Sequence, residues 1–157
     1  MIVVIQRVER AEVQVAPDGP TPTSRGIDEG LLVLCGFELG DTSPDVAWVA
    51  HKLLSLRVFE DSDGRMNESL EARTRGLLVV PNFTLAGDCR KGRRPSFDRA
   101  MPPESAAPRF EEFVDLLRAG PSRVEAGEFG AHMHVSLVND GPITLLLNSA
   151  DRPRRSS

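Results

Sequence analysis

The sequence has 157 residues, of which 40% are hydrophobic and 27% are charged, a balance typical of one globular domain rather than a disordered or fibrous chain. The formal net charge of −4 argues against a protein whose whole surface binds nucleic acid, because that binding scales with the phosphates neutralised. No apolar run approaches the roughly 20 residues that cross a bilayer, and the two cysteines form no C-x-x-C pair, so we expect a cytoplasmic protein without membrane contact or disulfides.

The first part of the chain predicts strands followed by a helix. Residues 1–8 have two apolar faces and predict a strand, and the alternation of apolar and polar residues resumes over 12–15. Proline, glycine and hydroxyl residues crowd 16–24, which we expect to be a loop. The apolar run 30–37 is typical of a strand buried on both sides. A helix is expected over 43–57, with Ser43 as its N-cap.

The second part of the chain predicts one more buried strand, a second helix and a terminal strand pair. The strand is expected over 76–81, and the helix carries an apolar stripe over 110–117. Strands over 132–138 and 143–147 flank Asn139-Asp140-Gly141-Pro142, whose composition is typical of a turn, so we expect a hairpin. Strands outnumber helices, which predicts an α+β fold: a mixed or antiparallel, barrel-like sheet with two flanking α-helices.

The sequence lacks the common hydrolase motifs, but one strand end has the composition of an anion site. Residues 81–87 leave the buried strand and lead into 88–99, where five basic residues accompany two acidic ones. Backbone amides at a strand end beside positive charge are suited to bind an oxyanion. We therefore place the candidate chemistry at this end of the strand.

Two other groups of side chains are weaker candidates. His132 and His134 lie two residues apart, hence on one face of a strand, and with a third donor could hold a metal ion; a polar strand face is the better explanation. Cys89 lies beside Arg90 and Lys91, which favours a thiolate, but nothing fixes a histidine near it. We interpret Cys89 as an ordinary surface cysteine and expect neither a metal nor a cofactor.

Six short motifs resemble those of the D-aminoacyl-tRNA deacylases and occur in the same order along the chain. They are Ile5-Gln6-Arg7-Val8, Arg65-Met66-Asn67, Phe83-Thr84-Leu85-Ala86, Arg94-Pro95-Ser96-Phe97, residues 127–133 and residues 135–144. Any one of these motifs is a weak signal, whereas six in register are a strong one. The resemblance covers one domain over about 1–148, and we expect the basic segment 149–157 to be a flexible tail.

The resemblance implies an enzyme that hydrolyses the ester between a D-amino acid, or glycine, and the 3′-terminal ribose of tRNA. The family is homodimeric, and a Gly-cisPro pair from one subunit enters the active site of the other. Gly141 and Pro142 match that pair, which rejects L-amino acids by leaving no room for their side chains. Arg7 matches the arginine that tethers the pair. The implied partners are tRNA and a second copy of the chain, and we expect no DNA partner.

The resemblance also assigns roles at the strand end. Main-chain N–H groups around Phe83 and Thr84 would stabilise negative charge on the reacting ester, with the Thr84 hydroxyl near the scissile bond. Asn82 is included among the catalytic candidates because it offers a side-chain amide there. Phe129 and Met133 match positions that line the pocket of the terminal adenosine. The residues expected to meet tRNA phosphates are Arg90, Lys91, Arg93 and Arg94.

One departure from the family pattern leaves alternatives open. Pro81-Asn82 stands where the family usually has Ser-Gln. A proline there is similar to a related group of deacylases that act on L-alanyl-tRNA and whose Gly-Pro bond is trans. A third alternative is a non-catalytic tRNA- or protein-binding module on the same fold. Arg7 and the Asn-Asp-Gly-Pro context favour the D-specific enzyme.

Overall fold

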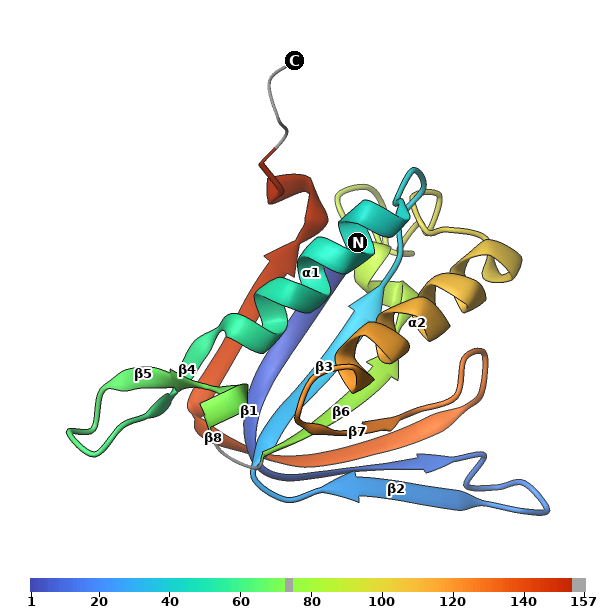
Figure 1. Cartoon of the computed structure of the whole chain (residues 1–157). Coiled ribbons are helices and arrows are strands. Elements are labelled where there is room, and N and C mark those ends of the chain that lie inside the picture. Colours follow the sequence, from blue (N-terminus) through green and yellow to red (C-terminus); the bar gives the residue numbers. More distant parts are fainter. Residues whose placement is uncertain (73–74, 154–157) are drawn as a thin grey trace.

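The computed structural model describes residues 1–72 and 75–153, where a strongly bent sheet carries two α-helices on one face (Figure 1). The strands are β1 (Ile2–Val15), β2 (Thr23–Ile27), β3 (Gly30–Gly36), β4 (Arg57–Glu60), β5 (Met66–Ser69), β6 (Gly76–Pro81), β7 (Arg123–Ala126) and β8 (Met133–Asn148). The α-helices are α1 (Ser43–Ser55) and α2 (Pro103–Arg118), and the short 3₁₀ helices are η1 (Leu70–Ala72), η2 (Phe83–Ala86) and η3 (Ser149–Asp151).

Strand β1 organises the sheet, because three other strands pair with it. Its first half pairs antiparallel with β3, its second half pairs antiparallel with β2, and β8 runs antiparallel along its whole length. Beyond β3 the sheet continues through β6 and β7, each parallel to its neighbour. The sheet is therefore mixed and nearly barrel-shaped, and with its two helices it confirms the predicted α+β architecture (Figure 1).

Strands β3 and β6 are buried on both faces, as their unbroken apolar runs predict. Leu31 and Leu77 face the helices and belong to the larger core, together with Phe113 of α2. Leu32 and Leu78, each one residue further along, belong to a smaller core on the other face, inside the bend of the sheet. Complete burial of one such side chain contributes about 1.5–3 kcal/mol, so these two central strands anchor both halves of the fold.

Both helices were predicted, but the N-cap of the first and the start of the second differ from the prediction. Thr42, not Ser43, is the N-cap of α1, and its N–H donates to the Asp45 carboxylate at 2.9 Å. Helix α2 starts at Pro103, well before its apolar stripe, because a proline at the first helical position needs no N–H partner. Among the described residues, no helix is long and apolar enough to cross a membrane.

Two predicted boundaries in the sheet are wrong. Residues 132–147 do not fold back as a hairpin: β8 is one continuous strand, and the turn-like stretch 139–142 is an irregularity within it. The predicted loop 16–24 ends two residues early, because β2 starts at Thr23 and pairs with Val15 of β1.

The predicted tail, 149–157, begins as a packed segment. Ser149 is buried, and its hydroxyl oxygen accepts a hydrogen bond from the Met1 amino group at 2.6 Å. Nε of Arg152 lies 3.0 Å from a carboxylate oxygen of Asp45 on α1. Residues 149–152 are thus held against the fold rather than frayed, and residues 154–157 of the prediction lie outside the described residues.

Candidate functional site

The most irregular part of the sheet is a bulge in β8, formed by residues 140–143, which carries Gly141 and Pro142. A single residue of β1, Arg7, stands opposite these four residues, so the extra chain loops out of the ladder. Gly141 and Pro142 are both exposed, and the peptide bond between them is cis, the state that the D-specific resemblance implies. Gly141 has φ of 135°, and a Cβ at this position would meet the backbone nitrogen of Ile143 at 2.7 Å.

The side chain of Asn139 closes the bulge. Its Oδ1 accepts a hydrogen bond from the N–H of Ile143 at 2.8 Å, and its Nδ2 donates to the Ile143 carbonyl at 3.2 Å. The same Nδ2 donates to the Thr144 hydroxyl, also at 3.2 Å. These bonds satisfy backbone groups that the bulge removes from the ladder. The chain therefore resumes β8 in its original direction instead of reversing, which is why a turn-like composition does not give a hairpin here.

Arg7 ties the bulge to the rest of the fold. Arg7 is only 6% exposed, and its Nε lies 3.0 Å from Oδ2 of Asp140 and donates to the Asp140 carbonyl at 3.3 Å. Its Nη1 donates to the carbonyl oxygen of Val58 in β4 at 2.9 Å. The guanidinium thus links the residue before Gly141 to a neighbouring strand. The structure places Arg7 against Asp140, the residue before the Gly-Pro pair.

The second predicted centre is the corner where β6 ends and η2 begins. Asn82 caps η2, because its Oδ1 accepts hydrogen bonds from the Thr84 N–H at 3.3 Å and from the Thr84 hydroxyl at 2.5 Å. The N–H of Phe83 donates to no described residue. The Phe83 ring is 57% exposed and packs edge-on against Phe97 at 5.1 Å between centroids. The corner therefore offers an N–H without a described acceptor and the hydroxyl oxygen of an exposed threonine.

A cavity of about 660 Å³, which we call the main cleft, opens beside this corner. Its polar lining consists of Asn82, Thr84, Gln6 and His132, and the remaining walls are mostly apolar side chains of β3, β6 and β8. Among the described residues that line it, His132 has the only titratable side chain. The main cleft thus holds hydrogen-bonding groups in apolar surroundings, and the described residues that line it include no paired nucleophile and base.

The main cleft unites some of the predicted site residues and leaves others apart. Met133 lines it beside the corner residues, whereas Gly141 and Pro142 of the same chain do not. Phe129 packs against Phe110 of α2, 6.3 Å between ring centroids, and lines a different cavity. Sequence reasoning did not identify Gln6 as a lining residue, although it lies in the first of the six motifs.

The basic segment after η2 is exposed, and its members differ in their partners. Nη2 of Arg90 lies 2.6 Å from a carboxylate oxygen of Asp88. Hydrogen bonds from Arg90 hold the pKa of Asp88 well below its usual range, and Asp88 raises the pKa of Arg90 in turn. Lys91, Arg93 and Arg94 have no carboxylate within 4.0 Å among the described residues. These three cations are therefore the ones available for an external anion.

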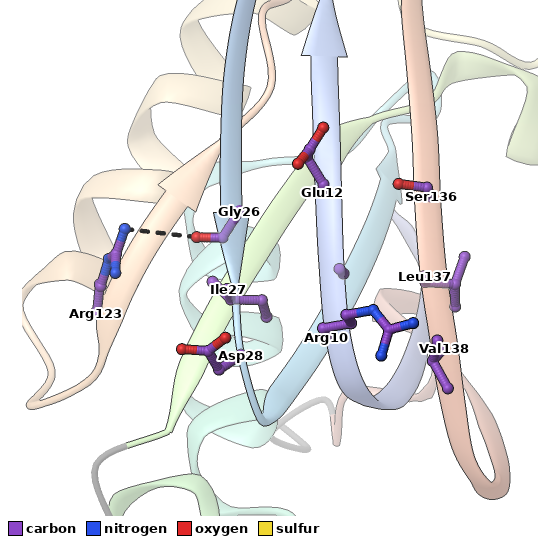
Figure 2. Close-up of a pocket in the computed structure, with 10 residues that line it drawn as sticks. Arg10, Glu12, Gly26, Ile27, Asp28, Arg123, Ser136, Leu137 and Val138 are labelled. Carbon is purple, nitrogen blue, oxygen red and sulfur yellow. Dashed lines mark hydrogen bonds between the residues drawn. The ribbon is translucent and has the colours of Figure 1, made fainter.

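A second hollow, of about 480 Å³, crosses β1, β2 and β8 (Figure 2). It is lined by charges of both signs, Arg10 and Arg123 on the one hand and Glu12 and Asp28 on the other. Arg123 is already engaged, since its Nη2 lies 2.8 Å from the carboxylate of Glu125. None of the residues that line this hollow was predicted to act in catalysis or tRNA binding, so the candidate site remains at the main cleft.

Comparison with known proteins gives one family for nearly the whole chain. Residues 4–148 match the sequence model of a family described as D-Tyr-tRNA(Tyr) deacylase. The chain is 51% identical to the D-aminoacyl-tRNA deacylase of Thermosipho africanus over 95% of its length and 97% of the relative's. It is 53% identical to the protein of that name from Myxococcus xanthus, over 95% of each chain.

Solved structures share the same architecture. A structure described as the c-Myc DNA unwinding element binding protein is 38% identical, with a TM-score of 0.85 over 94% of this chain and 98% of the other. A structure described as a probable eukaryotic D-amino acid tRNA deacylase is 19% identical, with a TM-score of 0.79 over 93% and 97%. The second likeness is one of fold alone.

Proposed function

The chain belongs to the D-Tyr-tRNA(Tyr) deacylase family, and we propose that it hydrolyses the ester bond between a D-amino acid, or glycine, and the 3′-terminal ribose of tRNA. The relatives named D-aminoacyl-tRNA deacylases, 44–53% identical, support this activity. The observation that carries the proposal is the corner at the main cleft, where the free Phe83 N–H and the Thr84 hydroxyl stand against apolar walls. Such a site can hold an ester carbonyl without a charged nucleophile.

The chemistry fits a site that orients rather than attacks. Water adds to the ester carbonyl carbon, the carbonyl oxygen gains negative charge, and the bond to the ribose oxygen then breaks. The proton lost by water ends on that ribose oxygen, which gives a free amino acid and a tRNA hydroxyl. An N–H aimed at the developing oxyanion in apolar surroundings is worth about 2.7–4 kcal/mol of transition-state stabilisation. The Phe83 N–H is suited to this role, because it has no described partner to give up.

Thr84 is assigned a positioning role. Its hydroxyl hydrogen points to Asn82 at 2.5 Å, so the oxygen keeps its lone pairs free to accept a hydrogen bond from the substrate. Asn82 in turn has its Oδ1 occupied by two donors from Thr84, which supports a fixed hydroxyl orientation. No described group that lines the main cleft besides His132 could take a proton from Thr84 as a general base, which argues against Thr84 as the nucleophile.

Rejection of L-amino acids is assigned to the bulge of a second copy of the chain. Gly141 and Pro142 are exposed and do not line the main cleft of their own chain. Several large hydrophobic side chains of β8 are also exposed, which supports association through this strand. They are Val135, Leu137, Leu145 and Leu146. In the proposed homodimer the bulge of each copy closes the cleft of the other, and its carbonyls occupy the space of an L side chain.

The basic segment is the proposed contact for the tRNA backbone. Lys91, Arg93 and Arg94 follow η2 directly in the chain and carry no described ion pair. A small group of cations a few residues beyond the corner in the chain can hold the 3′ end while the acidic remainder of the surface repels the rest of the tRNA. We propose that the protein acts in the cytoplasm, where aminoacylated tRNA is present.

The test measures deacylation of tRNA(Tyr) charged with D-tyrosine and with L-tyrosine, together with glycyl-tRNA and L-alanyl-tRNA. We expect release of D-tyrosine and glycine, with L-tyrosine and L-alanine left on the tRNA. Hydrolysis of L-alanyl-tRNA alone would favour the related L-alanyl deacylases instead. Binding of charged tRNA without release of any amino acid would indicate a non-catalytic binding module.

A further inference from the structure

A cluster of three metal-ligating side chains lies at the rim of the main cleft and has no part in the proposed reaction. Asp18 comes from the loop between β1 and β2, His132 lies directly before β8, and His134 is the second residue of β8. One potential ligand atom of each residue lies within 4.8 Å of those of the other two, and all three side chains are exposed. Two imidazoles and a carboxylate thus converge from two separate chain segments.

The backbone holds these segments together. His132 and His134 point to the same face because they are two residues apart on an extended chain, and their ring centroids are 5.2 Å apart. The N–H of Ala16 donates to the His132 carbonyl at 2.9 Å, which continues the β1–β8 ladder into the loop. Ala16 itself has φ of 47°, in the left-handed region, and its carbonyl accepts from the Gly19 N–H at 2.9 Å. This tight turn places Asp18 over the two histidines.

The donor set selects the class of ion. Two histidine nitrogens with one carboxylate oxygen are ligands that Zn²⁺ and similar transition metals take, usually with water in a fourth position. Mg²⁺ and Ca²⁺ prefer oxygen ligands alone. Metal–ligand distances of about 2.0–2.2 Å put the donor atoms of a tetrahedral site roughly 3.3–3.6 Å apart. Side-chain rotations that move the ligand atoms of these exposed residues by about an ångström are enough to bring all three within reach of one metal ion.

We propose that Asp18, His132 and His134 bind one Zn²⁺-class transition-metal ion and leave one coordination position open. The ion would join the β1–β2 loop to β8 at the rim of the main cleft, since His132 also lines that cleft. Binding to the folded chain alone stabilises it by mass action, so the melting temperature should rise with the metal concentration. The proposal concerns the metal site itself and does not depend on the activity toward tRNA.

The test is calorimetric titration of untagged, chelator-treated protein with ZnCl₂ and, separately, with MgCl₂. We expect saturable binding of one Zn²⁺ per chain, a raised melting temperature, and no comparable binding of Mg²⁺. His134→Ala and His132→Ala should each weaken Zn²⁺ binding by at least about tenfold, and Asp18→Asn by somewhat less.

Two control variants separate this site from other zinc-binding groups. His51→Ala removes the remaining histidine, which is exposed on α1, and Cys89→Ser removes the exposed thiol. Both should leave the Zn²⁺ affinity unchanged. The proposal is overturned if Zn²⁺ binding does not saturate, if it survives His134→Ala and His132→Ala, or if it follows Cys89 or His51. All substituted residues are exposed, and an unchanged melting temperature without metal will confirm that each variant folds.

Discussion

The bulge in β8 and the corner between β6 and η2 are both places where the chain leaves a regular strand, but they are held in opposite ways. In the bulge, Asn139 bonds twice to the backbone of Ile143, and the buried Arg7 bonds to Asp140. At the corner, the Asn82 side chain bonds only to Thr84 among the described residues, and the exposed Phe83 has an N–H with no described acceptor. One region is clamped, and the other is left open.

This difference fits two distinct tasks. Exclusion of a side chain requires a wall that does not yield, because a wall that relaxes by an ångström admits the wrong enantiomer. Stabilisation of a developing oxyanion requires donors that have no competing acceptor in the folded chain. Damage to the corner should therefore slow the reaction on the correct substrate, whereas damage to the bulge should admit the incorrect one.

The largest effect is expected at the corner. Thr84→Val removes the hydroxyl that positions the substrate and keeps the shape of the side chain, so it should lower kcat for D-tyrosyl-tRNA by about 100-fold with little change in selectivity. The variant should fold normally because Thr84 is exposed. Single-turnover deacylation measures the rate. Thr84→Ser, which keeps the hydroxyl, is the matched control; a fully active Thr84→Val enzyme would exclude a role for this group.

A smaller change is expected at the bulge. Asn139→Ala deletes the bonds to Ile143 and should let the Gly-Pro segment relax. The ratio of kcat/KM for D-tyrosyl-tRNA over L-tyrosyl-tRNA should then fall by about tenfold or more, mainly through faster hydrolysis of the L substrate.

The matched control for the bulge is Asn148→Ala. Asn148 is also an asparagine of β8, but among the described residues its Oδ1 accepts only from the Ala150 N–H, at 2.9 Å, at the end of the strand beyond the bulge. It should leave the D-over-L ratio unchanged. If Asn139→Ala lowers the melting temperature while the ratio stays at its wild-type value, the bulge serves stability rather than selection.

The smallest effects are expected in the basic segment. Replacing Arg93 and Arg94 together by Gln should weaken tRNA binding several-fold and make the slope of log affinity against log salt shallower by about 1 for each residue. Arg90→Gln should do less, because Asp88 already pairs with this guanidinium. Filter binding of tRNA over a salt series provides both quantities. If Arg90→Gln weakens binding as much as Arg93→Gln alone, the ion pair with Asp88 does not matter.

The sequence predicted the elements that have a regular pattern of apolar residues. It missed the elements whose course depends on a particular side-chain contact. The apolar runs of β3 and β6 indicate burial on both faces, and the structure has both. In contrast, Asn-Asp-Gly-Pro is typical of a turn, and no local pattern reveals that Asn139 bonds to Ile143 and keeps the strand straight.

The candidate site was predictable to a similar degree. The corner follows from a buried strand that ends before a basic segment, and Arg7 was placed beside Gly141-Pro142 by resemblance. The shape of the main cleft depends on contacts between strands that are distant in sequence. For that reason the sequence could not predict that Gln6 lines the main cleft, or that Phe129 lines a different cavity.

The central claim is that the open corner of one copy works with the clamped bulge of another. A mixed dimer of a Thr84→Val chain and an Asn139→Ala chain, isolated with two different tags, tests it directly. If the bulge acts across the interface, one of the two sites combines an intact corner with an intact bulge. The mixed dimer should then hydrolyse D-tyrosyl-tRNA at about half the wild-type rate and leave L-tyrosyl-tRNA intact. Hydrolysis of L-tyrosyl-tRNA at about half the rate of the Asn139→Ala homodimer would show that corner and bulge act within one chain, and would contradict the account.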